Sequence, residues 1–121
     1  MAPPLPDGLV VVVKEACATC RLVAPLLAKL TDLTVYTQDD PTFPPDVDVT
    51  FDEELAVSWH HAIETVPTLI RVADGEEIER TVGWSQAEWQ RITGVDNLGA
   101  DLPVMRPGCG SLSVDPDRVD A

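Results

Sequence analysis

The chain has 121 residues, 45% of them apolar, which is enough for the core of one domain. Its 21 acidic and 8 basic residues give a formal net charge of −13. This balance argues against binding to nucleic acid or to anionic membrane surfaces, since both require clustered Lys and Arg. The apolar run Leu9–Val13 is too short for a signal-peptide core or a membrane span. We therefore expect a cytoplasmic protein, although an exported chain whose signal has been removed would look the same.

The first thirty residues predict a strand followed by a helix. Residues 1–8 contain three prolines and a glycine and are interpreted as a flexible leader. Leu9–Lys14 is a nearly continuous β-branched run, which is typical of a strand buried on both faces. From Arg21 onward the apolar spacing is helical, and Pro25 is expected to kink this helix. The residues of its apolar face are Leu22, Val23, Leu26, Leu27 and Leu30.

The middle of the chain predicts two further strands around a short helix. Leu33–Thr37 is interpreted as a strand, and Asp39–Asp48, with three prolines and four acids, as a loop. Asp52 is placed to cap a short helix that ends near His61. Thr65–Val72 is predicted to form the third strand.

A hairpin and a helix complete the predicted domain. Asp74-Gly75 is a turn signal, so Glu77–Val82 is expected to return antiparallel to the preceding strand. Ser85–Glu88 forms a capping box that opens a helix, and Gly94 is placed to end it. Residues 95–121 contain prolines, glycines and several acids, and they are interpreted as an acidic tail or linker.

The predicted order of elements is β-α-β-α-β-β-α over residues 9–94. The first half is expected to form a parallel pair of strands with a right-handed crossover, and the second half an antiparallel hairpin. We therefore predict an α/β fold in which a four-stranded mixed sheet is flanked by three helices.

The strongest chemical signal is the pair of cysteines in Cys17-Ala18-Thr19-Cys20. The motif follows a predicted strand and opens a predicted helix. A thiol at a helix N-terminus lies among unpaired N–H groups at the positive end of the helix dipole, and these favour the nucleophilic thiolate. We therefore expect Cys17 to be the nucleophile, more exposed and more acidic than Cys20. Cys20, one turn away, is expected to attack the mixed disulfide.

Four features together resemble the thioredoxin family in order and spacing. They are the cysteine pair at a strand-to-helix junction, Pro25 five residues after the second cysteine, Val66-Pro67-Thr68 at the start of a strand, and Gly83 after the last strand. In that family these positions hold the redox pair, a helix kink, a cis-proline loop and a glycine near the active site. The resemblance covers about residues 9–94 and implies a thioredoxin-like three-layer fold.

The same resemblance implies a thiol–disulfide oxidoreductase. Its catalytic residues would be Cys17 and Cys20. Its substrate-binding residues would be Val66, Pro67, Gly83 and Trp84, with the Val66 backbone pairing to the substrate as an added strand. The substrate would be a disulfide-containing protein or a small-thiol compound. Electrons would come from a reductase or a low-molecular-weight thiol, with no bound cofactor and no metal.

The chain departs from thioredoxins proper around the motif. Ala16 replaces a Trp, and Ala18-Thr19 replaces Gly-Pro. Val11 replaces a buried Asp that helps proton transfer to the second cysteine. The N-terminal strand and helix of thioredoxins are also missing, so the chain is similar to a trimmed thioredoxin-like domain.

Two alternatives stay open at this point. The domain could be a non-catalytic adaptor or metal-binding module within a longer protein, with its cysteine pair idle or holding a metal. Cys109, in Arg106-Pro107-Gly108-Cys109-Gly110, is either a bystander in a linker or an accessory thiol that resolves a Cys17 mixed disulfide. In the second case Arg106 would favour the Cys109 thiolate.

Overall fold

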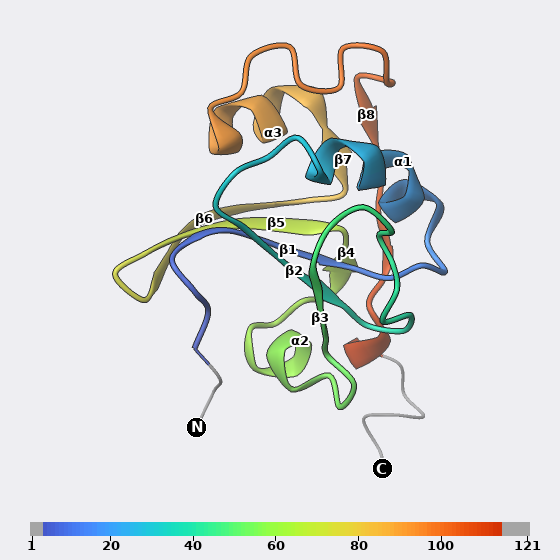
Figure 1. Cartoon of the computed structure of the whole chain (residues 1–121), viewed down its shortest axis with the longest axis vertical. Coiled ribbons are helices and arrows are strands. Elements are labelled where there is room, and N and C mark those ends of the chain that lie inside the picture. Colours follow the sequence, from blue (N-terminus) through green and yellow to red (C-terminus); the bar gives the residue numbers. More distant parts are fainter. Residues whose placement is uncertain (1–3, 115–121) are drawn as a thin grey trace.

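A computed structural model describes residues 4–114 and places a five-stranded mixed sheet at the centre (Figure 1). The strand order is β3-β2-β1-β5-β6. These strands are β1 (Gly8–Val13), β2 (Leu33–Thr37), β3 (Val49–Phe51), β5 (Thr68–Ala73) and β6 (Glu76–Val82). The helices are α1 (Ala18–Leu27), α2 (Ala56–His60) and α3 (Gln86–Thr93). α1 and α3 lie on one side of the sheet and α2 on the other, so the predicted α/β arrangement is confirmed (Figure 1).

β1 is the central strand, and both of its faces are covered. All residues of Leu9–Val13 are buried. The strand pairs in parallel with β2 and antiparallel with β5. A continuous β-branched run suits this position, because no side chain of the strand has to face water. The C-terminal end of β1 leads directly into the loop that carries the first cysteine.

The sheet has five strands where four were predicted, and the additional strand is β3. It pairs in parallel with β2, with Val49 opposite Val35. It has only three residues and lies at the edge of the sheet, with Thr50 and Phe51 exposed. So short a run carries too little periodicity to indicate a strand. The four-stranded prediction was wrong for this reason.

Asp52 is not the N-cap residue of α2, a position that Leu55 occupies, but its carboxylate still accepts N–H groups of the first turn. Its carboxylate accepts hydrogen bonds from the backbone N–H groups of Val57 (3.1 Å) and Ser58 (2.9 Å). It also accepts one from the Ser58 hydroxyl (2.7 Å). The helix itself begins at Ala56 and ends at His60. Asp52 is buried, so these bonds compensate for the loss of its hydration.

The two other helices begin at the side chains that cap them. α1 begins at Ala18, directly after Cys17, as predicted for a motif that opens a helix, and the Cys17 sulfur accepts a hydrogen bond from the N–H of Cys20 in the first turn. Ser85 caps α3 by accepting a bond from the N–H of Glu88 (3.4 Å), and Gly94 ends that helix in a left-handed conformation (φ 73°). The prediction for α3 is confirmed.

The segment after Gly94 lies against the domain. β8 (Met105–Arg106) pairs antiparallel with β7 (Trp84–Ser85), and β9 (Cys109–Gly110) pairs antiparallel with β4 (Thr65–Val66). A 3-10 turn, η1, follows at Leu112–Val114. Figure 1 shows this segment in orange and red, running down the side of the molecule past α1. The interpretation as a tail or linker therefore does not describe the chain up to residue 114, and residues 115–121 lie outside the described residues.

Part of the predicted leader also packs on the domain. Leu5 is buried in the core, and the Asp7 carboxylate accepts a hydrogen bond from the N–H of Gly75 (2.9 Å). Residues 1–3 of that leader lie outside the described residues. The chain from Leu5 onward is thus held to the domain by an apolar contact and by a bond to the β5–β6 turn.

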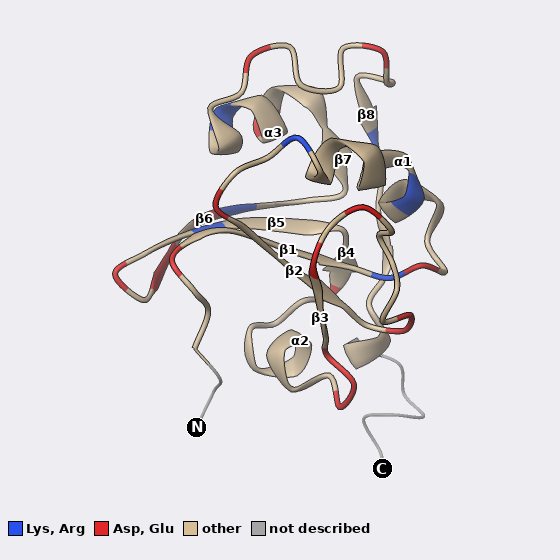
Figure 2. Ribbon diagram, viewed as in Figure 1, with Lys and Arg blue, Asp and Glu red and all other residues tan. Residues whose placement is uncertain are grey.

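The charged residues lie mainly at the surface of the loops and sheet edges. Acidic residues are spread over loops at several places around the domain (Figure 2). The ion pairs are exposed, as for Arg91–Glu79 and Arg21–Glu15, and each contributes little to stability. Among residues 4–114, no helix is long and apolar enough to cross a membrane.

Truncation of a core residue is expected to lower the free energy of unfolding much more than truncation of an exposed residue in the adjacent strand. Leu69 in β5 is fully buried, whereas Ile78 in β6 is 56% exposed. We expect Leu69→Ala to lower the free energy of unfolding by about 2–5 kcal/mol, because it leaves a cavity in the core. Ile78→Ala should change it by about 0.5 kcal/mol or less. Urea unfolding of both variants measures the difference, and equal losses would contradict the assigned register of the sheet.

Candidate active site

Cys17 is held at the N-terminus of α1 by a fixed loop. After β1, the backbone N–H groups of Glu15 and Ala16 both donate to the Asp39 carboxylate, at 2.7 and 3.0 Å. Cys17 itself has extended backbone angles and is the N-cap residue of α1. The predicted junction of strand, cysteine pair and helix is therefore present, and Asp39 is the side chain that holds the loop in place.

The Cys17 sulfur has two backbone neighbours. It accepts a hydrogen bond from the N–H of Cys20 (3.2 Å), and it lies 3.6 Å from the carbonyl oxygen of Val66. The Val66–Pro67 peptide bond is cis in the structure. The structure thus places Val66, 49 residues further along the chain, beside the Cys17–Cys20 pair, and all three residues were predicted to belong to one site.

Both cysteines of the motif are buried. Cys17 is 1% exposed and Cys20 is 0% exposed. This difference is too small to test the expectation that Cys17 is the more exposed of the two. Both thiols are shielded, and the segment 105–110, which was predicted to lie outside the domain, pairs with the Val66 edge beside Cys17 and covers the site. All three cysteines carry free thiols.

The three thiols differ in acidity. Burial acts to raise the pKa of Cys17, but hydrogen bonds from the Cys109 and Cys20 thiols and from the N–H groups of Cys20 and Thr19 outweigh it, so this pKa is lowered. Burial raises the pKa of Cys20 far above its ordinary value, and the neighbouring Cys17 sulfur raises it further. The predicted order, with Cys17 more acidic than Cys20, agrees with these directions.

Cys109 belongs to the same cluster of thiols. In β9 it lies opposite Val66 of β4, whose carbonyl oxygen is 3.6 Å from the Cys17 sulfur. Burial and the contact with Cys17 raise the pKa of Cys109. The expectation that Arg106 would favour a Cys109 thiolate is therefore wrong. Arg106 lies in β8, opposite Trp84, and its side chain is exposed.

The backbone edge that was expected to receive a substrate is occupied by the chain itself. Val66 pairs with Cys109, in the antiparallel geometry of an added strand. Gly83 donates its N–H to the carbonyl oxygen of Pro67 (2.8 Å) and faces Gly108. A Cβ atom at Gly83 would lie 2.9 Å from the Gly108 nitrogen, so the close approach of these two backbones requires glycine.

Trp84 holds the chain just before the covering segment against the domain. Its indole N–H donates to the carbonyl oxygen of Pro103 (2.7 Å), and its ring packs against Trp89 with centroids 5.4 Å apart. Trp84 is 1% exposed. Direct contact of its ring with a substrate would therefore require the segment around Pro103 to move.

Sequence reasoning missed the polar side chains that bind the covering segment. The Thr19 hydroxyl donates to the carbonyl oxygen of Pro107 (2.6 Å), and the Lys14 ammonium donates to that of Gly110 (2.6 Å). Lys14 was assigned only to the end of the first predicted strand. These bonds end on backbone oxygens, so the sequence at the receiving end carries no signal for them. Among the described residues, no group of three or more His, Cys, Asp or Glu could hold a metal ion.

Comparison with known proteins finds one relevant similarity. The chain is 33% identical over 75 residues to Thioredoxin H-type 1 of Nicotiana tabacum. The aligned part is 62% of this chain and 54% of the relative, so the match spans about half the length of that protein. No protein-family model matches the chain. The chain is thus similar to a thioredoxin over part of its length.

Removal of the Cys109 thiol is expected to shift the titration of Cys17. A thiolate forms as the pH rises through the pKa, and the bond from Cys109 helps to lower that pKa. Cys109→Ala should therefore move the Cys17 midpoint to higher pH. Thiolates absorb in the ultraviolet, so each protein is titrated with and without an added Cys17→Ser substitution. The difference between the two absorbance curves is the titration of Cys17. An unchanged or lower midpoint would contradict the contact between the two thiols.

Two glycines of the covering segment provide a matched pair for testing whether it shields Cys17. A Cβ atom at Gly108 would lie 2.4 Å from the carbonyl oxygen of Val66, whereas one at Gly110 would meet nothing within 4 Å. Such overpacking costs typically about 1–3 kcal/mol, so Gly108→Ala should increase the open population and the alkylation rate of Cys17 by about 5- to 100-fold. Gly110→Ala should leave the rate unchanged. Peptide mapping after timed alkylation gives both rates, and equal rates would show that β9 does not control access.

Proposed function

We propose that the chain is a thiol–disulfide oxidoreductase of thioredoxin-like type that reduces disulfides through Cys17 and Cys20. The observation that carries this proposal is the position of the Cys17 sulfur. It caps α1, accepts the N–H of Cys20 and lies beside the Val66 carbonyl. The partial similarity to a thioredoxin supports the same chemistry.

In the first step, the Cys17 thiolate attacks one sulfur of the substrate disulfide. A Cys17–substrate bond forms, the substrate S–S bond breaks, and the second substrate sulfur leaves as a thiolate. The lowered pKa of Cys17 increases the fraction of nucleophile near neutral pH. The N–H of Cys20, which donates to the Cys17 sulfur at 3.2 Å, stabilises that thiolate before attack.

In the second step, Cys20 resolves the mixed disulfide. Its sulfur attacks Cys17, the Cys17–Cys20 bond forms, and the remaining substrate sulfur leaves and takes up a proton. Two electrons pass from the cysteine pair to the substrate. The raised pKa of Cys20 keeps it protonated until this step, so Cys17 rather than Cys20 makes the first attack.

Substrate recognition is proposed to use the backbone edge of Val66, next to Pro67, with Gly83 and Trp84 beside it. Because β9 now occupies this edge, a protein substrate has to displace β9 before it pairs with Val66. A reductase or a low-molecular-weight thiol would return electrons to the cysteine pair. The reducing direction matches the cytoplasmic location expected from the sequence.

Turnover of a disulfide substrate distinguishes this function from an adaptor or metal-binding role. We expect the chain to accelerate the reduction of insulin by dithiothreitol, and Cys17→Ser to abolish the acceleration because no other thiol caps α1. Thermal unfolding of Cys17→Ser shows whether that variant is folded. Gly108→Ala is assayed in parallel, so that a covered site is not mistaken for an inactive one. Lack of acceleration by both the parent chain and Gly108→Ala would refute the proposal.

A further inference from the structure

The proposed reaction uses two thiols, but the structure places three at the site. Cys109 lies opposite Val66 in an antiparallel pair, and the Val66 carbonyl oxygen is 3.6 Å from the Cys17 sulfur. A protein substrate that pairs with Val66 would present its cysteine from this same strand position. Cys109 therefore stands where the proposed function puts the sulfur of a substrate.

The strand that carries Cys109 is held on both sides of that residue. Before it, the carbonyl oxygen of Pro107 accepts a bond from the Thr19 hydroxyl of α1 (2.6 Å). After it, the carbonyl oxygen of Gly110 accepts one from the Lys14 ammonium (2.6 Å). Both donors lie within three residues of Cys17 along the chain. The segment is thus positioned by the same loop and helix that position the nucleophile.

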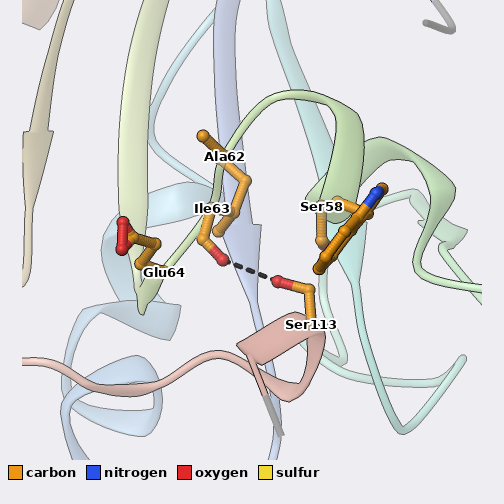
Figure 3. A pocket seen from close by; sticks show the side chains of 6 residues that line it. Ser58, Ala62, Ile63, Glu64 and Ser113 are labelled. Carbon is orange, nitrogen blue, oxygen red and sulfur yellow. Dashed lines mark hydrogen bonds between the residues drawn. The ribbon is translucent and has the colours of Figure 1, made fainter. Parts of the chain in front are cut away.

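A buried hydrogen-bond network anchors the chain beyond Cys109. The amide group of Gln38 donates to the Ser111 hydroxyl (2.7 Å), and its oxygen accepts the N–H of Leu112 (3.0 Å). The Ser113 hydroxyl donates to the carbonyl oxygen of Ile63 (2.8 Å), beside a pocket of about 230 Å³ near α2 (Figure 3). Bonds to buried polar groups are costly to break. These bonds therefore hold β9 against the domain until a substrate displaces it.

The residue before Cys109 allows the close approach. A Cβ atom at Gly108 would lie 2.4 Å from the Val66 carbonyl oxygen and 2.6 Å from Cγ2 of Thr65. Only glycine fits at this distance without a shift of the backbone. The approach of β9 to β4, and with it the position of Cys109, thus depends on the absence of one side chain.

We propose that Cys109 is a further catalytic residue, an internal redox partner that exchanges a disulfide with Cys17. This inference rests on the proposed function, which generates the oxidised Cys17–Cys20 pair. The Cys109 thiol loses its proton, and its sulfur attacks Cys17. The Cys17–Cys109 bond forms as the Cys17–Cys20 bond breaks, and Cys20 leaves with the electron pair and takes up the proton. The exchange consumes no oxidant, since one disulfide replaces another.

Two features of the site favour this exchange. Reacting groups held together in one molecule behave as if each were present at a very high concentration, on the order of 10⁵ M or more when well oriented. In addition, Cys109 is only partly buried: burial and Cys17 raise its pKa, while the backbone N–H groups of Thr19 and Ala18 act to lower that pKa. The Cys17–Cys109 disulfide would fix β9 on the Val66 edge and leave Cys20 reduced.

The test uses the full chain with Cys20→Ser and glutathione disulfide as the probe. Cys17 should first form a mixed disulfide with glutathione. Cys109 should then displace the glutathione and form a Cys17–Cys109 disulfide within one chain, which mass spectrometry of the intact protein and of its peptides detects. Cys20→Ser combined with Cys109→Ser is the control, and it should retain the glutathione on Cys17.

The outcomes separate this inference from the proposed function. If the single variant retains glutathione as the control does, or forms only disulfide-linked dimers, Cys109 is not a partner of Cys17 and this inference is overturned. If Cys17 takes up no glutathione in the control variant, even when Gly108→Ala is added to uncover the site, the proposed nucleophile fails as well, and both proposals are overturned.

The two glycines of β9 add a test of geometry. In the Cys20→Ser chain, Gly108→Ala should slow the displacement of glutathione by roughly 100-fold, because a shift of about 1 Å is enough to misplace a reacting group by that factor. Gly110→Ala should leave that rate unchanged, since nothing lies near its Cβ position. Equal rates in the two variants would show that Cys109 reacts from a detached segment, and this would overturn the assigned role of β9.

Discussion

The antiparallel pairing of β9 with β4 decides how the rest of the site is arranged. It places Cys109 opposite Val66, whose carbonyl oxygen neighbours the Cys17 sulfur. It also covers Cys17, so that a residue at the start of a helix is as buried as a core valine. Without this pairing, the cysteine pair would stand at the open end of α1, as the sequence alone suggested.

The contacts that shield Cys17, the proposed nucleophile, also affect its acidity. The covering segment removes water from Cys17, which by itself raises the pKa, yet it also supplies the Cys109 hydrogen bond that helps to lower it. The Cys17 thiol is thus prepared for attack while access to it is restricted. Reaction with an external disulfide requires movement of a segment held by Thr19 and Lys14, and the free energy of that movement adds to the barrier.

The parts of the fold that follow from local patterns could be predicted from the sequence. The β-branched run of β1, the Ser85 cap of α3 and the strand-to-helix position of Cys17 each depend on neighbouring residues, and the structure contains all three. β3 could not be predicted because three residues carry almost no periodicity, and its pairing depends on the exposed edge of β2.

The covering segment escaped prediction for a different reason. Its contacts are mainly backbone pairings and bonds from distant side chains to carbonyl oxygens, and these leave no pattern in the residues that receive them. Gly108 lets the backbone of β9 approach a partner closely. The partner, however, is Val66 of the same chain, and only the three-dimensional arrangement identifies it.

The surroundings of Cys20 give a physical reason for a third thiol. Val11 is fully buried in β1 and has no group that can accept a proton. Burial is also the largest cause that raises the pKa of Cys20. Cys109, by contrast, is only partly buried, although burial and Cys17 raise its pKa too. A partly exposed thiol forms its thiolate more readily than one in an apolar core. The proposed exchange therefore uses a second sulfur that is less buried than Cys20 and lies opposite Val66, the residue whose carbonyl oxygen neighbours Cys17.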